Sequence, residues 1–226
     1  MKVSLVSYSS PTQELAKSNV DNIQELVAYC ARVSNPSNQF NKETSDKLIH
    51  YLVRHKHWSP LEMASACLEI ETTRDIARQI LRHRSFSFQE FSQRYADPVK
   101  ELEMVTRAAR FQDPTNRQNS LPFDLSDPDD AAINNQWYKR QYELIAKVKE
   151  VYTWAIDNGI AKEQARAVLP EGLTMSRMYV NGTLRSWIHY IELRSANGTQ
   201  LEHMMIAKQV GAVIAAIFPI AKDFVE

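Results

Sequence analysis

The sequence predicts an α+β protein with a small, mainly antiparallel sheet and several long helices. Two short segments, 2–8 and 66–71, alternate apolar and polar residues with the period of a half-buried strand. Much longer segments repeat apolar residues every three or four positions, as amphipathic helices do. A length of 226 residues is typical of one domain, so we treat residues 1–226 as a single domain.

The first predicted elements are a strand over 2–8 and a helix with Ile23 and Val27 on its apolar stripe. Asp21, with Gln24 three residues later, is a plausible cap for this helix. A second helix then runs into a turn at residues 55–60, and its inner face carries Leu48, Ile49, Leu52 and Val53.

The strand at 66–71 leads into a helix that begins near Arg74 and has Thr73 as a candidate cap. Arg78 and Arg82 lie four residues apart on its polar side and therefore stack on one face. If the chain after this helix is extended, its spacing of two places three polar groups on one side, those of Glu90, Ser92 and Arg94.

Residues 97–128 have loop-like signals, including four prolines. A long irregular stretch of this kind is often a binding loop, so we predict that it covers a substrate. A helix of nearly thirty residues follows over 129–158, and Gly159 terminates it.

The last third of the chain predicts a short helix around Ala165 and a strand over 173–180. Thr183 is expected to cap the next helix, and Thr199 with Glu202 forms a capping-box pattern before the final one. That final helix is apolar nearly all round over 204–218, which predicts burial, with a subunit interface as one possible place.

The composition excludes several classes of protein. Lys plus Arg and Asp plus Glu are 27 each, which argues against a general nucleic-acid binder. Two cysteines are too few for a disulfide framework, the N-terminus lacks a signal-peptide hydrophobic run, and the longest apolar run is too short to span a bilayer. We therefore expect a cytoplasmic protein (in the host cytoplasm if the source is viral) with no nucleic-acid or membrane partner.

Phosphate, if bound, must be held by side chains. The chain has only 5 glycines, and none are spaced as in a dinucleotide fingerprint or a P-loop. Eight of the arginines fall between Arg74 and Arg117, and arginine binds phosphate and carboxylate bidentately. This cluster indicates either a pocket for a small anion or a solvated charged face.

Arg194 is the most unusual of the arginines. Helix geometry places it on the apolar stripe of the helix that begins near Leu184. A buried guanidinium is costly unless acceptors or an anion meet it. Either Glu192 or another acid satisfies Arg194, or a ligand does.

Three further groups of residues have a chemical interpretation. Arg82-His83-Arg84 at a helix end forms either a binding site or a surface arginine network. His55 and His57 could be two zinc ligands, but they lack a third at useful spacing, so we predict no metal. Cys30 and Cys67 show no sign of an activated thiol.

These residues resemble a known family. RHRSFSFQEFS, in which seven residues separate Arg84 from Ser92, matches the signature of the flavin-dependent thymidylate synthases. RHKHWSPLE at 54–62, ARAVLP at 165–170, NGTLRSWIHYIELR ending at Arg194 and the following TQLEH resemble further segments of that family in the same order.

The resemblance implies the reductive methylation of dUMP to dTMP. Methylenetetrahydrofolate donates the carbon and becomes tetrahydrofolate, FAD reduced by NADPH supplies hydride, and no cysteine nucleophile takes part. It also implies a homotetramer with FAD at subunit interfaces.

The resemblance also assigns roles residue by residue. It implies catalytic roles for Arg194, which stabilises an N3-deprotonated pyrimidine, for His57, which positions flavin or folate, and for the hydrogen-bonding Ser92. Residues matching FAD contacts are Ser59, Arg82, His83, Arg84, Glu90, Thr183, Arg185 and His189. Residues matching dUMP contacts are Gln79, Arg82, Glu90, Ser92, Gln93, Arg94, Arg166 and Arg194. Departures from the common family pattern are Gln93, Met204 and His189.

Two other functions compete with this one. An arginine-rich nucleotide- or RNA-binding regulatory protein would need no flavin and would bind RNA with a steep salt dependence. A histidine-metal phosphohydrolase would hold a stoichiometric metal.

Overall fold

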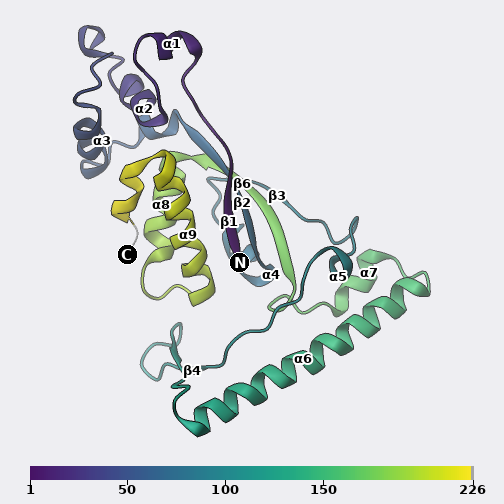
Figure 1. The fold of residues 1–226 in the computed structure, drawn as a ribbon. Coiled ribbons are helices and arrows are strands. Elements are labelled where there is room, and N and C mark those ends of the chain that lie inside the picture. Colours follow the sequence, from purple (N-terminus) through teal and green to yellow (C-terminus); the bar gives the residue numbers. More distant parts are fainter. Residues whose placement is uncertain (225–226) are drawn as a thin grey trace.

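The fold is built around one antiparallel sheet flanked by helices, in a computed structural model that describes residues 1–224 (Figure 1). The sheet has four strands in the order β1-β2-β6-β3, so the class predicted from the sequence is confirmed. Its strands are β1 (Lys2–Tyr8), β2 (Ser65–Thr73), β3 (Ser87–Glu90) and β6 (Met175–Thr183). The helices are α1 (Gln13–Lys17), α2 (Ile23–Ala31), α3 (Ser45–Arg54), α4 (Arg74–Ile80), α5 (Pro98–Glu101), α6 (Pro128–Asp157), α7 (Lys162–Ala165), α8 (Leu184–Ser195) and α9 (Leu201–Ile217). Short 3-10 helices are η1 (Pro36–Asn38), η2 (Ser59–Glu62), η3 (Arg166–Val168) and η4 (Pro219–Phe224).

The core lies between the sheet and helices α8 and α9. Strand β2 alternates as the sequence predicts, with Ala66, Leu68 and Ile70 buried and the residues between them partly exposed. Helix α9 packs on β1 and β2, while α8 packs on β6 (Figure 1). Burial within a single chain therefore partly explains why α9 carries apolar residues nearly all round.

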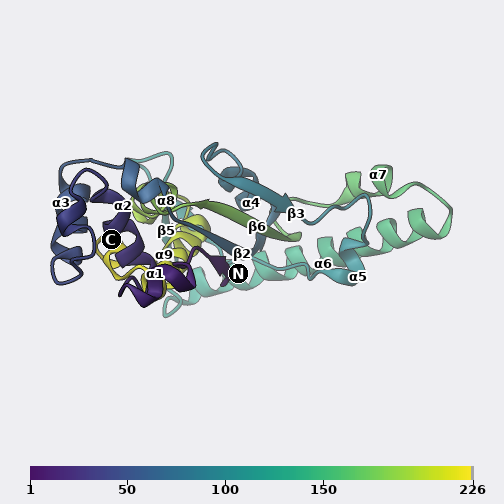
Figure 2. The same ribbon diagram turned by 90° about the horizontal axis from the view of Figure 1, so that it is seen from above.

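Helix α6, with 30 residues, is the longest helix of the described structure. It lies apart from the sheet, on the side of the molecule opposite α2 and α3 (Figure 1), and it extends toward the end farthest from them (Figure 2). Two buried amides hold it to the preceding segment: Asn134 accepts from the N–H of Ala109 at 3.0 Å, and Gln141 exchanges two hydrogen bonds with the backbone of Arg107. Large apolar side chains on its outer surface remain exposed, namely Ile133, Trp137, Tyr142, Leu144 and Trp154.

Three predicted helix caps differ from the structure. Thr73 stands at the N-cap position of α4, but its hydroxyl donates to the carboxylate of Asp75 and caps no backbone N–H. The side chain of Asn22, rather than that of Asp21, accepts from the N–H of Glu25 and caps α2. Helix α9 has no capping box, because its N-cap residue is Gln200 rather than Thr199 and the carboxylate of Glu202 binds Arg110. The predicted cap at Thr183 is confirmed, since its hydroxyl accepts from the N–H of Ser186.

Two predicted irregular or extended segments also differ from the structure. Residues 97–128 contain α5 and a two-stranded hairpin of β4 (Arg110–Gln112) and β5 (Ser120–Pro122), so they are not a plain loop. The extended alternation does not continue past Glu90. A turn begins at Ser92, whose carbonyl accepts from the N–H groups of Tyr95 and Ala96, and this turn breaks the spacing of two.

Gly182 makes a testable close contact within the sheet. A Cβ atom added to Gly182 would lie 2.3 Å from the ring of Phe86, which is 8% exposed. We expect Gly182→Ala to lower the free energy of unfolding by about 1–3 kcal/mol, because the ring must leave its packed position. Urea denaturation measures the change. Gly172→Ala is the matched control, since its nearest neighbours lie at 3.9 Å, and an equal loss in both variants would contradict the prediction.

Candidate active site

Arg194 and His83 form the centre of the candidate site. Arg194 lies in the last turn of α8, and its Nε donates to Nε2 of His83 at 2.9 Å. His83 is in the turn after α4, where its N–H bonds the carbonyl of Ile80. Among residues 1–224, no carboxylate lies within 4.0 Å of the Arg194 guanidinium, so Glu192 does not pair with it.

The electrostatics of this pair favour a neutral histidine. Burial, and then the positive charges of Arg194 and Arg82, lower the pKa of His83 to about 4. A neutral imidazole has one acceptor nitrogen, and here Nε2 accepts from the arginine. The positive charge of Arg194 is therefore left without a counter-charge from the described residues and can meet an anion.

Behind this pair, a series of hydrogen-bonded polar side chains joins α8, α4 and α9, with Tyr190 and His203 buried and Gln79 and Gln200 half-buried. The hydroxyl of Tyr190 lies 3.1 Å from Nε2 of His203, and Nδ1 of His203 lies 3.1 Å from Oε1 of Gln79. Nε2 of Gln79 donates to Gln200 at 2.8 Å. Gln79, for which the family resemblance implies substrate binding, is therefore held from two sides.

A second cluster surrounds Glu90 at the end of β3. Its side chain is 16% exposed, forms ion pairs with Arg74 and Arg78, and accepts from the hydroxyl of Ser176 at 2.8 Å. Burial lowers the pKa of Arg74, and the positive charges of Arg78 and Arg166 add to this while Glu90 opposes it. Two guanidinium groups, those of Arg74 and Arg78, therefore pair with one largely buried carboxylate.

A third cluster joins η2 to α8. The rings of Trp58 and His189 lie 4.5 Å apart, and Arg185 forms an ion pair with Glu62. Burial lowers the pKa of His189. Ser59 is the first residue of η2, so the structure brings three of the predicted cofactor residues, those at 59, 185 and 189, to one junction.

The remaining predicted residues are more dispersed. Arg82 and Arg84 are exposed beside His83, and His57 is exposed with its ring near those of Tyr51 and His55. Arg94 forms an exposed ion pair with Glu163 at 3.3 Å. Gln93 is 4% exposed, and its Nε2 has no hydrogen-bond partner within the described part of the chain.

Three further observations bear on the competing chemistries. Burial raises the pKa of both thiols, Cys30 and Cys67, which disfavours the reactive thiolate. Within residues 1–224, no group of three His, Cys, Asp or Glu side chains could hold a metal ion. No helix in the same range has the length and apolar character needed to cross a membrane.

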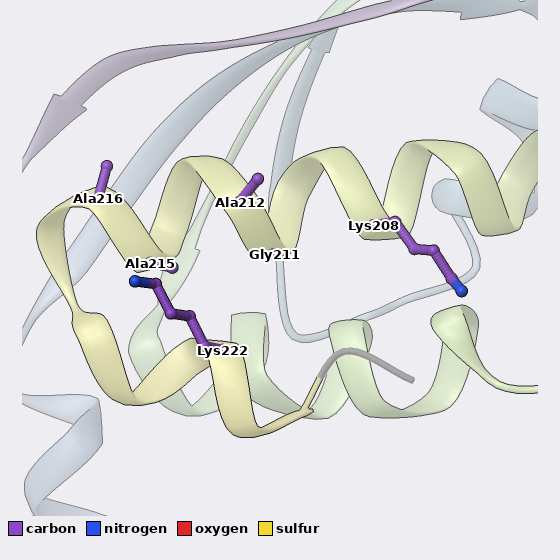
Figure 3. A pocket seen from close by; sticks show the side chains of 6 residues that line it. All are labelled: Lys208, Gly211, Ala212, Ala215, Ala216 and Lys222. Atoms are coloured by element: carbon purple, nitrogen blue, oxygen red, sulfur yellow. The ribbon is translucent and has the colours of Figure 1, made fainter.

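One surface hollow lies away from these clusters. It has a volume of about 400 Å³ and follows the small residues of α9, with Lys208 and Lys222 at its two ends (Figure 3). It contains none of the site residues predicted from the sequence. We therefore place the chemistry at the polar clusters and not in this apolar groove.

Sequence reasoning missed several polar residues of these clusters. The sequence places Arg78 on the polar side of its helix without indicating a role for it, and Arg74 is only the expected start of that helix. No local pattern indicates a role for Tyr190 or His203. The available signal was a histidine within a helix that is apolar nearly all round, because such a side chain requires partners from other elements.

Comparisons with known proteins agree with this arrangement. The family model described as "Thymidylate synthase complementing protein" matches residues 14–220. A probable flavin-dependent thymidylate synthase of Paramecium bursaria Chlorella virus 1 is 48% identical over 97% of this chain and 96% of its own. A flavin-dependent thymidylate synthase of Synechocystis is 46% identical over 86% of this chain and 85% of its own.

A solved structure has the same fold. The UMP/dUMP methylase PolB of Streptomyces cacaoi, bound with 5-Br dUMP, superposes with a TM-score of 0.78 and 27% identity, over 98% of this chain and 93% of its own. The fold and these matches define an enzyme of the nucleotide-methylating class. More particularly, the chain belongs to the family of flavin-dependent thymidylate synthases.

Proposed function

We propose that the chain converts dUMP to dTMP with methylenetetrahydrofolate as carbon donor and FAD, reduced by NADPH, as hydride source. The C5 hydrogen of the uracil leaves as a proton, and the methylene carbon becomes a methyl group by gaining hydride. Tetrahydrofolate and oxidised FAD are the other products. The family relationship and the dUMP analogue bound to the structural relative support this proposal.

The observation that carries the proposal is the uncompensated charge of Arg194. Uracil C5 is a poor nucleophile, and deprotonation of N3 makes the ring electron-rich. A guanidinium fixed by a neutral His83 can stabilise that anion without reorganising, which is the main way that a preorganised site lowers a barrier. No thiolate is required, and both thiols have a raised pKa.

The phosphate of dUMP needs cationic donors, and the guanidinium groups of Arg74 and Arg78 are already paired with Glu90. We infer that Arg94 and Arg166 bind the phosphate oxygens, with hydrogen bonds from Gln79, Ser92 and the amide of Gln93. The unpartnered Nε2 of Gln93 supports this role, because a buried donor without a partner is costly. Glu90 holds Arg74 and Arg78 in place and limits the net positive charge.

The residues at the junction of η2 and α8 fit a flavin nucleotide. The edge-to-face rings of Trp58 and His189 suit an aromatic ring, and the guanidinium of Arg185, which pairs with Glu62, suits its polar groups. We assign His83, Glu90, Thr183 and the exposed Arg82 and Arg84 to the same cofactor, and His57 to flavin or folate positioning. Bound FAD supplies the hydride.

We further propose that the active protein is a single-domain homotetramer in the cytoplasm with FAD sites at subunit interfaces. Arg82 and Arg84 are exposed in one chain, and α6 exposes large apolar side chains, as an assembling protomer would. Residues 97–128, which carry the hairpin, are proposed to cover the substrate.

The absorbance spectrum of the purified protein tests the cofactor assignment. We expect flavin bands, release of FAD on denaturation, and dTMP formation that requires dUMP, methylenetetrahydrofolate and NADPH together. A colourless protein that cannot be reconstituted with FAD would contradict the proposal, as would dTMP formation through an adduct to Cys30 or Cys67. Replacing both cysteines by alanine is the control and should leave the rate largely unchanged.

A further inference from the structure

Two fully buried polar side chains behind Gln79 have no role in the function proposed above. His203 of α9 is 0% exposed, and Tyr190 of α8 is 1% exposed. They bond each other, and His203 also bonds Gln79. Burying these groups is costly unless every donor meets an acceptor, so the direction of each hydrogen bond matters.

An ion pair at one end of this series of hydrogen bonds fixes the direction of each bond. Glu202 forms an ion pair with Arg110 at 2.8 Å, with side chains 11% and 19% exposed. Burial favours the neutral acid, but hydrogen bonds from Arg110, the backbone and Gln200 outweigh it and lower the pKa of Glu202. A carboxylate only accepts, so Gln200 must turn its amide nitrogen toward Glu202, at 3.0 Å.

The orientation of the Gln200 amide in turn determines the orientations of Gln79 and His203. Oε1 of Gln200 faces Gln79 and accepts from its nitrogen, which leaves the oxygen of Gln79 facing His203. An amide oxygen only accepts, so Nδ1–H of His203 donates to it, and Nε2 of His203 accepts from the hydroxyl of Tyr190. Burial and the charge of Arg194 lower the pKa of His203 to about 3, in accord with a neutral ring.

We propose that Tyr190 and His203 are positioning residues that hold the Gln79 amide with one N–H free to donate to an acceptor oxygen of dUMP. This inference rests on the proposed function, in which Gln79 contacts dUMP. Gln79 has two N–H bonds and gives one to Gln200, so one remains. A flipped amide would set an acceptor against an acceptor at Gln200 and a donor against a donor at Nδ1–H of His203.

The first test separates KM from kcat. We expect His203→Leu to raise the KM for dUMP about tenfold, because Gln79 loses the group that orients it, with kcat changed less than about threefold. His203→Asn keeps an N–H near the Nδ1 position and should recover most of the affinity. An unchanged KM in His203→Leu, or no recovery in His203→Asn, would overturn the proposal.

A double-mutant cycle distinguishes positioning from general damage to the fold. In a Gln79→Ala background, His203→Leu should give no further rise in KM, because the effect passes through the missing amide. Additive effects would overturn the proposal. Ile206→Val, at a buried apolar residue of the same helix, is the matched control and should leave KM unchanged.

The ring tautomer gives a readout that does not depend on turnover. Solid-state ¹⁵N NMR of histidine-labelled protein, with His203→Asn for assignment, should show His203 neutral at pH 7 with the proton on Nδ1. A proton on Nε2 or a charged ring would refute the inferred directions. A wild-type protein that makes no dTMP would instead refute the proposed function.

Discussion

Replacing Arg194 by alanine is expected to lower dTMP formation about 10²- to 10³-fold while the protein keeps its oligomeric state. The guanidinium has no carboxylate partner among residues 1–224 and is held by the neutral His83, so its charge is available to a pyrimidine anion. Loss of one preorganised group that stabilises developing charge has an effect of this size. Chromatographic quantification of dTMP at saturating dUMP measures it.

Two variants make the Arg194 result specific. Arg194→Lys keeps the positive charge but lacks the planar fork of donors, so we expect it to remain impaired. Arg177→Ala removes a partly exposed arginine that pairs with Glu71 and should retain most of the activity. Turnover of Arg194→Ala at the wild-type rate would refute the assigned role.

The second large effect is expected at Glu90. Glu90→Gln should lower the free energy of unfolding by about 3 kcal/mol, because Arg74 would stay buried without its counter-charge. We choose the lower end of the usual range because the side chain of Arg78 is 40% exposed and can be hydrated. Urea denaturation at fixed protein concentration measures the change, since the proposed assembly would also contribute to stability.

A second glutamate on the same sheet is the matched control for Glu90. Glu71 pairs with Arg177 at 2.8 Å, but the side chains are 30% and 46% exposed. An exposed pair contributes less than about 1 kcal/mol, so Glu71→Gln should have a small effect. If Glu90→Gln and Glu71→Gln lower the free energy of unfolding equally, burial of the Glu90 ion pairs does not account for their contribution to stability.

The fold was predictable where a single segment determines its own structure. The alternation around Leu68 predicts β2, and the apolar repeat that ends at Gly159 predicts α6. The capping box at Thr199 failed because Glu202 is bound by Arg110, which lies 92 residues earlier in the chain. Local pattern cannot anticipate a distant competitor for the same carboxylate.

The sequence predicts which arginines belong to the candidate site, but it does not predict the side chains that bind them. Helix geometry alone placed Arg194 on a buried stripe, while its acceptor, His83, comes from another element 111 residues away. The spacing of Ser92 and Arg94 failed because a turn replaces the expected strand. The family resemblance supplied the remaining assignments, and their roles stay predictions.

The length of helix α6 has a consequence for handling the protein. Its 30 residues extend about 45 Å, farther than the small sheet can cover, which leaves Trp137 and Trp154 facing water in a solitary protomer. An exposed apolar surface of this kind promotes association, so concentrated preparations of unassembled chain would be the first to precipitate.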